Sequence, residues 1–181
     1  MRISKNKTLY SPTDLNNFVS CKYHIKNDLL ADDLKLKKKE KSADLKLRIE
    51  YGKQHETKYF KLLKNKNSLS ITINPHQTPE KRFEETKLAL TKGYKLIYKA
   101  YLIEKDFRGE CDFLLKVKNK SKLGDYSYEV HETKVAKNLK SLHVLQITGY
   151  SYLLSKIQGN IPINMHLIDG ASKIHSFKVS E

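Results

Sequence analysis

The sequence predicts one α/β domain in which a central mixed β-sheet is flanked by helices, with a helical segment at the N-terminus. The 181 residues match the size of a single domain, and we expect one domain over residues 1–181. Apolar residues recur first at helical spacing and later at strand spacing. The resulting order of helices, adjacent strands, a helix and a final strand pair is typical of a sheet with helices packed against it.

The N-terminal part, residues 1–43, is expected to form a helix followed by a basic linker. Ser11 can cap a helix and Pro12 suits its first position, so a helix is predicted over residues 11–30. The lysine-rich stretch 35–41 is predicted to be an exposed connection or the fraying end of a helix.

The rest of the chain is predicted from the hydrophobic period and from residues that end helices or form turns. Helices are predicted over residues 44–64, 78–92 and 138–156, with Gly93 and Gly159 after the last two. Strands are predicted over residues 69–73, 94–103, 107–117, 126–134, 161–168 and 173–179. Short turn-forming loops separate the three central strands, so we expect hairpins between them.

The net charge of the chain indicates which classes of binding partner are expected. The net charge is +15, from 35 Lys and Arg residues against 20 Asp and Glu residues. Such a balance suits a polyanionic partner, with nucleic acid first and an anionic membrane surface second. Nearly all the basic residues are lysines, which an AT-rich genome also produces. A merely solvated basic surface is therefore the alternative explanation.

Composition excludes several classes of protein and of site. No stretch approaches the roughly 18 consecutive apolar residues of a membrane-spanning helix, so no membrane partner is expected. The first residues contain no apolar segment of a secretory signal. Cys21 and Cys111 are too few for a disulfide framework or a four-cysteine zinc or iron–sulfur site. A reducing, cytoplasmic location is therefore expected.

Three charged residues in two predicted neighbouring strands are candidates for catalysis. Residues two apart in a strand share a face, so Glu132 and Lys134 present a carboxylate and an ammonium group side by side. That face also carries Val130 and should be partly buried, where a charge is costly unless it is paired or binds a metal. If the strand carrying Asp112 pairs with this one, two carboxylates and a lysine converge.

This arrangement suits hydrolysis with a divalent metal ion. Carboxylate oxygens are preferred ligands of hard cations such as Mg²⁺ and Mn²⁺. A lysine beside the metal can orient a water molecule and lower its pKa, while the metal shields phosphate charge. The alternative is structural, because a cross-strand ion pair also explains a Glu-x-Lys sequence in a lysine-rich chain. His131 alternates with Glu132, so its side chain is expected on the other face.

Five short motifs then occur in a fixed order along the chain. They run from Ser11 to Cys21, from Gly52 to Glu56, from Arg108 to Leu114, from Leu123 to Lys134 and from Gln146 to Tyr150. In this order they resemble the PD-(D/E)xK nuclease superfamily, and most closely its RecB-like branch. That branch includes CRISPR-associated RecB-like exonucleases and predicted RecB-family nucleases. The resemblance spans about residues 9–170 and implies a restriction-endonuclease-like core.

The resemblance implies a catalytic centre built from matching residues. Asp112, Glu132 and Lys134 are the implied catalytic residues, with Lys134 positioning and activating the attacking water. The two carboxylates and the backbone carbonyl of Thr133 are implied to hold Mg²⁺ or Mn²⁺. His55 is implied to be the additional metal ligand typical of RecB-like enzymes.

Further residues are implied to surround this centre. Gln146 and Tyr150 are one helical turn apart and share a helix face, on which they would line the site or touch DNA. Glu56 is implied to assist. No iron–sulfur cluster is expected, because the branch that carries one uses four cysteines and only Cys21 lies at a comparable place.

The implied function is that of a metal-dependent nuclease that hydrolyses DNA phosphodiester bonds in DNA repair, recombination or defence. Besides DNA, the family suggests a helicase or a second nuclease domain as a partner. Two other functions stay open, namely a non-catalytic nucleic-acid-binding module or assembly subunit, and a metal-dependent RNA processor. Intact Asp112, Glu132 and Lys134 favour the nuclease, because a degenerate module is expected to have lost at least one of them.

Overall fold

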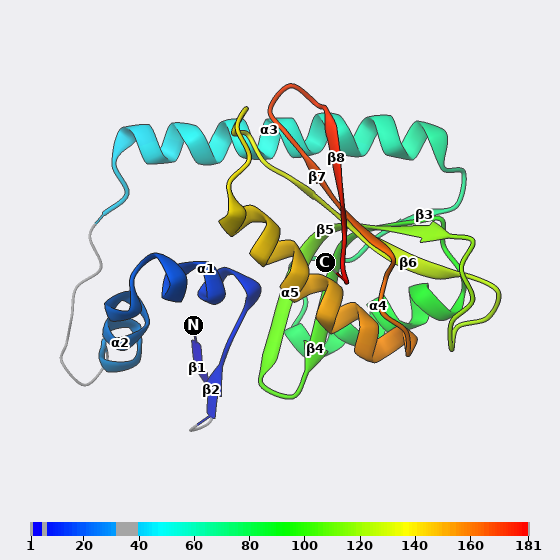
Figure 1. Cartoon of the computed structure of the whole chain (residues 1–181), viewed down its shortest axis with the longest axis horizontal. Coiled ribbons are helices and arrows are strands. Elements are labelled where there is room, and N and C mark those ends of the chain that lie inside the picture. Colours follow the sequence, from blue (N-terminus) through cyan, green and yellow to red (C-terminus); the bar gives the residue numbers. More distant parts are fainter. Residues whose placement is uncertain (1, 5–6, 32–39, 181) are drawn as a thin grey trace.

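The computed structural model describes residues 2–4, 7–31 and 40–180 and has an α/β architecture (Figure 1). A six-stranded mixed sheet is flanked by helices, as the sequence predicts, and a separate two-stranded sheet lies at the N-terminus. No helix in the described ranges has the length and apolar character needed to cross a membrane.

The six strands of the main sheet are hydrogen-bonded in the order of the chain. They are β3 (Ser70–Thr72), β4 (Leu96–Glu104), β5 (Phe107–Val117), β6 (Ser127–Thr133), β7 (Asn164–Ile168) and β8 (Ile174–Lys178). The pairs β4–β5, β5–β6 and β7–β8 are antiparallel, which confirms the predicted hairpins. The pairs β3–β4 and β6–β7 are parallel, and a helix connects the two strands of each, as parallel pairing requires.

The helices cover both faces of this sheet. Helix α3 (Ala43–Lys66) packs Tyr59 and Leu63 against one face, beside Phe113 of β5. Helices α4 (Pro79–Thr91) and α5 (Ser141–Gln158) pack against the other face in a larger core cluster. Figure 1 shows α3 along one side of the sheet and α5 on the opposite side.

The N-terminal segment differs from the prediction. The predicted single helix over residues 11–30 is wrong, because extended backbone at Cys21 separates α1 (Pro12–Ser20) from α2 (Lys22–Leu30). Helix α1 is held by tertiary contacts, since Pro12 fills the space beside Gly149 where a Cβ atom would lie 3.1 Å away. Helix α2, by contrast, has no buried residue.

Two further N-terminal features concern the first ten residues and the basic stretch. Strands β1 (Arg2–Ser4) and β2 (Lys7–Leu9) form an antiparallel pair that the sequence did not predict. After them, the Tyr10 N–H donates to the Asp106 carbonyl at 2.8 Å, which ties this segment to the start of β5. Most of the stretch 35–41 lies outside the described residues, so its predicted exposure stays a prediction.

The alternation of side chains along β4 and β5 is interrupted at Lys99 and Asp112. Cys111 and Leu114 are three residues apart, yet both lie in the core cluster under α5, whereas Phe113 lies in the cluster under α3. The pairing of β5 with β6 ends at Phe113 and His131. From His131 onward β6 pairs with β7 on its other side. Strands β5 and β6 are therefore no longer paired at Asp112, the residue that precedes Phe113 in β5.

Candidate active site

Asp112 and Glu132 lie side by side at the point where β5 and β6 separate. The backbone N–H of Asp112 donates to Glu132 Oε2 at 3.1 Å. The backbone N–H and hydroxyl group of Thr133 donate to Asp112 Oδ2 at 2.9 and 2.7 Å. Both carboxylates are buried, at 9% and 6% exposed. Side-chain hydrogen bonds therefore take the place of strand pairing and fix the two carboxylates against each other.

Lys134 joins this pair from the residue after β6. Its Nζ lies 3.2 Å from Glu132 Oε1 and donates to Gln146 Oε1 of α5 at 3.0 Å. Gln146 Nε2 in turn donates to the Thr13 hydroxyl of α1 at 3.4 Å. Tyr150, one helical turn further along α5, is buried and hydrogen-bonded to Gln146. The predicted residues of α5 are thus held in one network with the end of β6.

A second lysine, which the sequence did not single out, lies among the carboxylates. Lys99 Nζ is 2.6 Å from Glu56 Oε1 and 3.2 Å from both Glu110 Oε1 and Asp112 Oδ1. Glu110 also pairs with Arg82 of α4. The expected assisting residue Glu56 therefore contacts Asp112 through Lys99, and residues of α3, α4, β4 and β5 meet here.

Burial and charge act strongly on these groups. Burial, reinforced by the negative charge of Asp112, raises the pKa of Glu132 to about 7, although Lys134 opposes the shift. Burial and Asp112 likewise raise the pKa of Glu56. Burial by itself would lower the pKa of Lys99, but Asp112 and Glu56 outweigh it and hold that pKa above its usual range. The negative charges of Asp112 and Glu56 thus favour the charged form of Lys99.

The charges at the centre are nearly, but not fully, balanced. Ion pairs connect four carboxylates and three cations here, the cations being Lys99, Lys134 and Arg82. Fully ionised, the group has one negative charge left over. A buried excess of negative charge favours the binding of a further cation.

The residues fit a hard divalent cation in donor type, although they are not arranged as its coordination shell. Asp112 and Glu132 supply carboxylate oxygens, the preferred donors for Mg²⁺ or Mn²⁺. His55, on α3 beside Glu56, has a buried Nε2 atom without a hydrogen-bond partner among the described residues. Within those same ranges no three His, Cys, Asp or Glu side chains are placed so that they could hold a metal ion. The ligand roles of His55 and of the Thr133 carbonyl therefore stay predictions.

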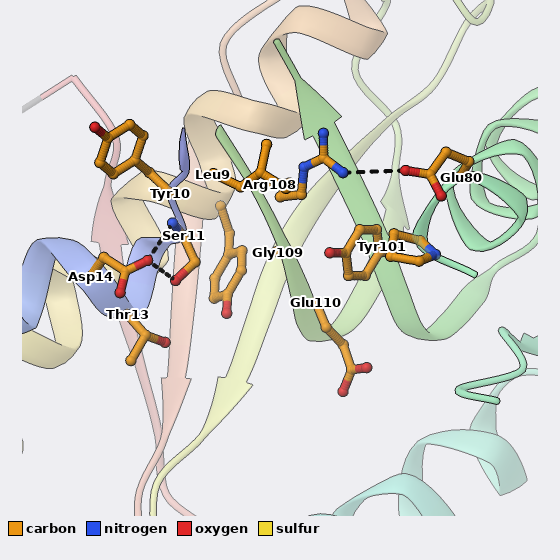
Figure 2. Close-up of a pocket in the computed structure, with 12 residues that line it drawn as sticks. Leu9, Tyr10, Ser11, Thr13, Asp14, Glu80, Tyr101, Arg108, Gly109 and Glu110 are labelled. Atoms are coloured by element: carbon orange, nitrogen blue, oxygen red, sulfur yellow. Dashed lines mark hydrogen bonds and ion pairs between the residues drawn. The ribbon is translucent and has the colours of Figure 1, made fainter. Parts of the chain in front are cut away.

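A cavity of about 500 Å³ opens beside this centre (Figure 2). Figure 2 shows Tyr10 and Thr13 of the N-terminal segment on one side and Tyr101 of β4 on the other. Glu110 and Tyr150, which both belong to the network above, also line it. Its volume lies within the range of small-ligand sites, and it reaches the centre through Glu110 and Tyr150, since Asp112 and Glu132 themselves do not line it.

Sequence reasoning missed Lys99, Glu110 and Arg82. One signal was available, because Lys99 is a charged residue within an otherwise apolar strand, Leu-Ile-Tyr-Lys-Ala-Tyr-Leu-Ile. In a lysine-rich chain that signal has little weight. Comparison with known proteins adds no assignment, since neither a protein-family model nor a curated protein matches the chain.

Proposed function

We propose that this chain is a metal-dependent nuclease that hydrolyses DNA phosphodiester bonds, with a restriction-endonuclease-like core of the RecB-like PD-(D/E)xK kind. The observation that supports this most is the buried pair of Asp112 and Glu132 with Lys134 beside it, at the place where two strands separate. DNA repair, recombination or defence is the process in which such an enzyme would act.

In this proposal the side chains divide the work between holding a cation and handling a proton. Asp112 and Glu132 hold Mg²⁺ or Mn²⁺, with His55 and the Thr133 carbonyl as further ligands. The bound ion supplies charge neutralisation at the phosphate and acidifies a water molecule. Lys134 orients the attacking water, and its contact with Gln146 at 3.0 Å fixes the ammonium group for that task.

The substrate side of the proposal rests on the cavity and on charge. Tyr10 is 42% exposed and lines the cavity, so its ring is available for stacking on a base. Arg108 lines the cavity as well, and its Nη1 lies 3.4 Å from Glu80 Oε1. Exposed lysines near α5 (Lys137, Lys140 and Lys156) and the net charge of +15 support contacts with phosphates.

The second candidate is a non-catalytic nucleic-acid-binding module or assembly subunit. The observation that favours it is Lys99, whose ammonium group already pairs with three of the four carboxylates. A lysine in that place can stabilise the carboxylate cluster in the folded state without any metal. The two functions differ in one measurable property, which is cleavage that depends on a divalent metal.

The test is cleavage of end-labelled single-stranded DNA, double-stranded DNA and RNA in Mg²⁺, Mn²⁺ or EDTA. We expect metal-dependent cleavage that Asp112→Asn abolishes and that Glu129→Gln, a change on the opposite face of β6, leaves within about twofold. Calorimetry with Mn²⁺ should show one site that Asp112→Ala removes. Salt-dependent DNA binding without cleavage in any metal would favour the module, and an absence of both would reject both functions.

A further inference from the structure

Lys99 has an unusual backbone conformation for the middle of a strand. Its φ angle is +59°, in the left-handed region that is unfavourable for a residue with a Cβ atom. The alternation of β4 breaks at this residue, because Ile97 and Ala100 both pack into the core under α5. The chain therefore accepts backbone strain at the residue that delivers an ammonium group to the carboxylates.

The ammonium group of Lys99 lies among three of these carboxylates. It forms ion pairs with Glu56 at 2.6 Å and with Glu110 and Asp112 at 3.2 Å each. Of these contacts, the one to Asp112 Oδ1 also has hydrogen-bond geometry. Lys99 thus places a positive charge at the centre of the cluster, where a metal ion would place one.

Lys99 contacts the less occupied oxygen of Asp112. Asp112 Oδ2 already accepts two hydrogen bonds from Thr133, at 2.9 and 2.7 Å. Its other oxygen, Oδ1, accepts from Lys99 Nζ at 3.2 Å. A cation that binds Asp112 through Oδ1 would therefore lie close to the ammonium group of Lys99.

We propose that Lys99 is an intramolecular cation that competes with the divalent metal ion for Asp112. The inference rests on the proposed function, because the ion concerned is the one that the nuclease uses. Two positive charges a few ångströms apart repel in a buried site, so the ammonium group of Lys99 weakens the binding of the ion. Lys99 therefore sets the metal concentration at which the site fills.

The experiment is Mn²⁺ titration of the full chain by calorimetry, with thermal melting in EDTA and in Mn²⁺ as a second readout. Lys99→Met removes the competing charge, and we expect it to tighten Mn²⁺ binding at least tenfold, on the order expected for one neighbouring charge. Lys99→Arg keeps the charge and should bind Mn²⁺ no tighter than the parent. Lys87→Met is the matched control, because Lys87 pairs with Glu84 on α4 outside the cluster, and its affinity should stay within about twofold of the parent.

Each outcome decides between the inference and its alternatives. Tighter binding in Lys99→Met that Asp112→Asn abolishes in the same background supports the competition, whereas equal or weaker binding than in the parent overturns it and leaves the metal site standing. Absence of Mn²⁺ binding in both the parent and Lys99→Met overturns the competition together with the metal-dependent function. If Lys99→Met does not fold in EDTA, Lys99→Gln is the second variant. Recovery of its melting transition on adding Mn²⁺ supports the inference, and no recovery rejects it.

Discussion

Strand β6 carries two buried polar clusters, one on each face, and they respond to burial in opposite ways. On the face toward α3, Glu129 pairs with His166 at 2.9 Å and accepts from the Asn164 backbone N–H at 2.9 Å. Burial would raise the pKa of Glu129, but these hydrogen bonds outweigh it and lower that pKa. On the other face, burial and Asp112 raise the pKa of Glu132. Two glutamates three residues apart are thus held in opposite electrostatic states.

The two clusters also differ in how far their charges are paired. In the Glu129 cluster each charged group finds a complementary partner, and His166 also bonds to Ser176 at 2.9 Å. His131 stacks on His166 with ring centroids 4.1 Å apart, on the face opposite Glu132, as the alternation predicted. Around Glu132 the carboxylates outnumber the cations that pair with them. Buried groups with perturbed pKa values and incomplete charge pairing are typical of functional sites, and for this reason our proposed function is assigned to the Glu132 cluster.

The largest expected effect concerns Lys134, which belongs to the Glu132 cluster. If Lys134 acts on the attacking water, Lys134→Ala loses an interaction that matters in the transition state, while metal and DNA affinity stay near the parental values. Single-turnover cleavage should then fall at least ~100-fold. A destabilised variant with near-parental cleavage would instead show that Lys134 only forms an ion pair with Glu132.

The next effect uses pH to test the raised pKa of Glu132. A carboxyl group whose pKa is raised in the folded state favours folding below its ordinary value of about 4.5, and this contribution is lost as the pH rises through about 7. In EDTA, Glu132→Gln should therefore raise stability by roughly 3 kcal/mol at pH 8 and change it little at pH 4.5. Thermal melting across this range measures the effect. A loss of stability at pH 8 would mean that Lys134 fully compensates the buried charge.

The raised pKa of Glu132 also predicts how metal binding depends on pH. Protons compete with the divalent ion for Glu132, so Mn²⁺ affinity should weaken as the pH falls below about 7. Calorimetry at pH 6 and pH 8 checks this for the parent. The Glu129→Gln variant is the control and should show the same pH dependence, because Glu129 belongs to the cluster on the opposite face.

For the Glu129 cluster the expected effect is on stability alone. Glu129→Gln weakens a charge-assisted hydrogen bond to His166 and should lower stability by about 1–2 kcal/mol at neutral pH. Because the pKa of Glu129 is lowered on folding, this contribution is present above its ordinary pKa and is lost as the pH falls through the lowered value. Denaturant melts at pH 7 and pH 3.5 measure the difference. A loss of cleavage in well-folded Glu129→Gln would show that the Glu129 cluster also contributes to cleavage.

The smallest expected effect concerns DNA binding at the cavity. The cavity adjoins the Glu132 cluster, so Tyr10→Ala should weaken DNA binding about fivefold, the lower end of one lost stacking contact. Tyr23→Ala is the matched control, because Tyr23 is 61% exposed on α2 and does not line the cavity. Fluorescence anisotropy with a labelled oligonucleotide in EDTA provides the measurement. Equal losses in both variants would show that the cavity has no special part in binding.

Much of the fold was predictable from sequence because its signals are local. The hairpins around β5 follow from turn residues between apolar runs, and α5 ends at Gly159, whose φ of +74° suits glycine. Helix α4 begins after Thr78, whose hydroxyl accepts from the Lys81 backbone N–H at 3.4 Å. Each of these signals lies within a few neighbouring residues, so it can be recognised in the sequence without the tertiary structure.

The site was only partly predictable, because its geometry depends on contacts between distant residues. Strand alternation indicated that Glu132 and Lys134 share a face, and the structure brings Asp112 to them. Nothing local indicates that Lys99 leaves the β conformation, or that it meets Glu56, which is 43 positions away on a helix.

From α3 onward, the elements, their order and the chemical types available to the site therefore follow from the sequence, whereas the β1–β2 pair and the division of α1 from α2 do not. Only the tertiary structure decided which of many charged residues meet. Helix α1 brings Thr13 to Gln146, 133 positions further along the chain. The separation of β5 from β6 replaces backbone pairing with bonds to Asp112 and Glu132. Both depend on packing across the sheet, which stabilises local conformations that the neighbouring residues alone do not favour.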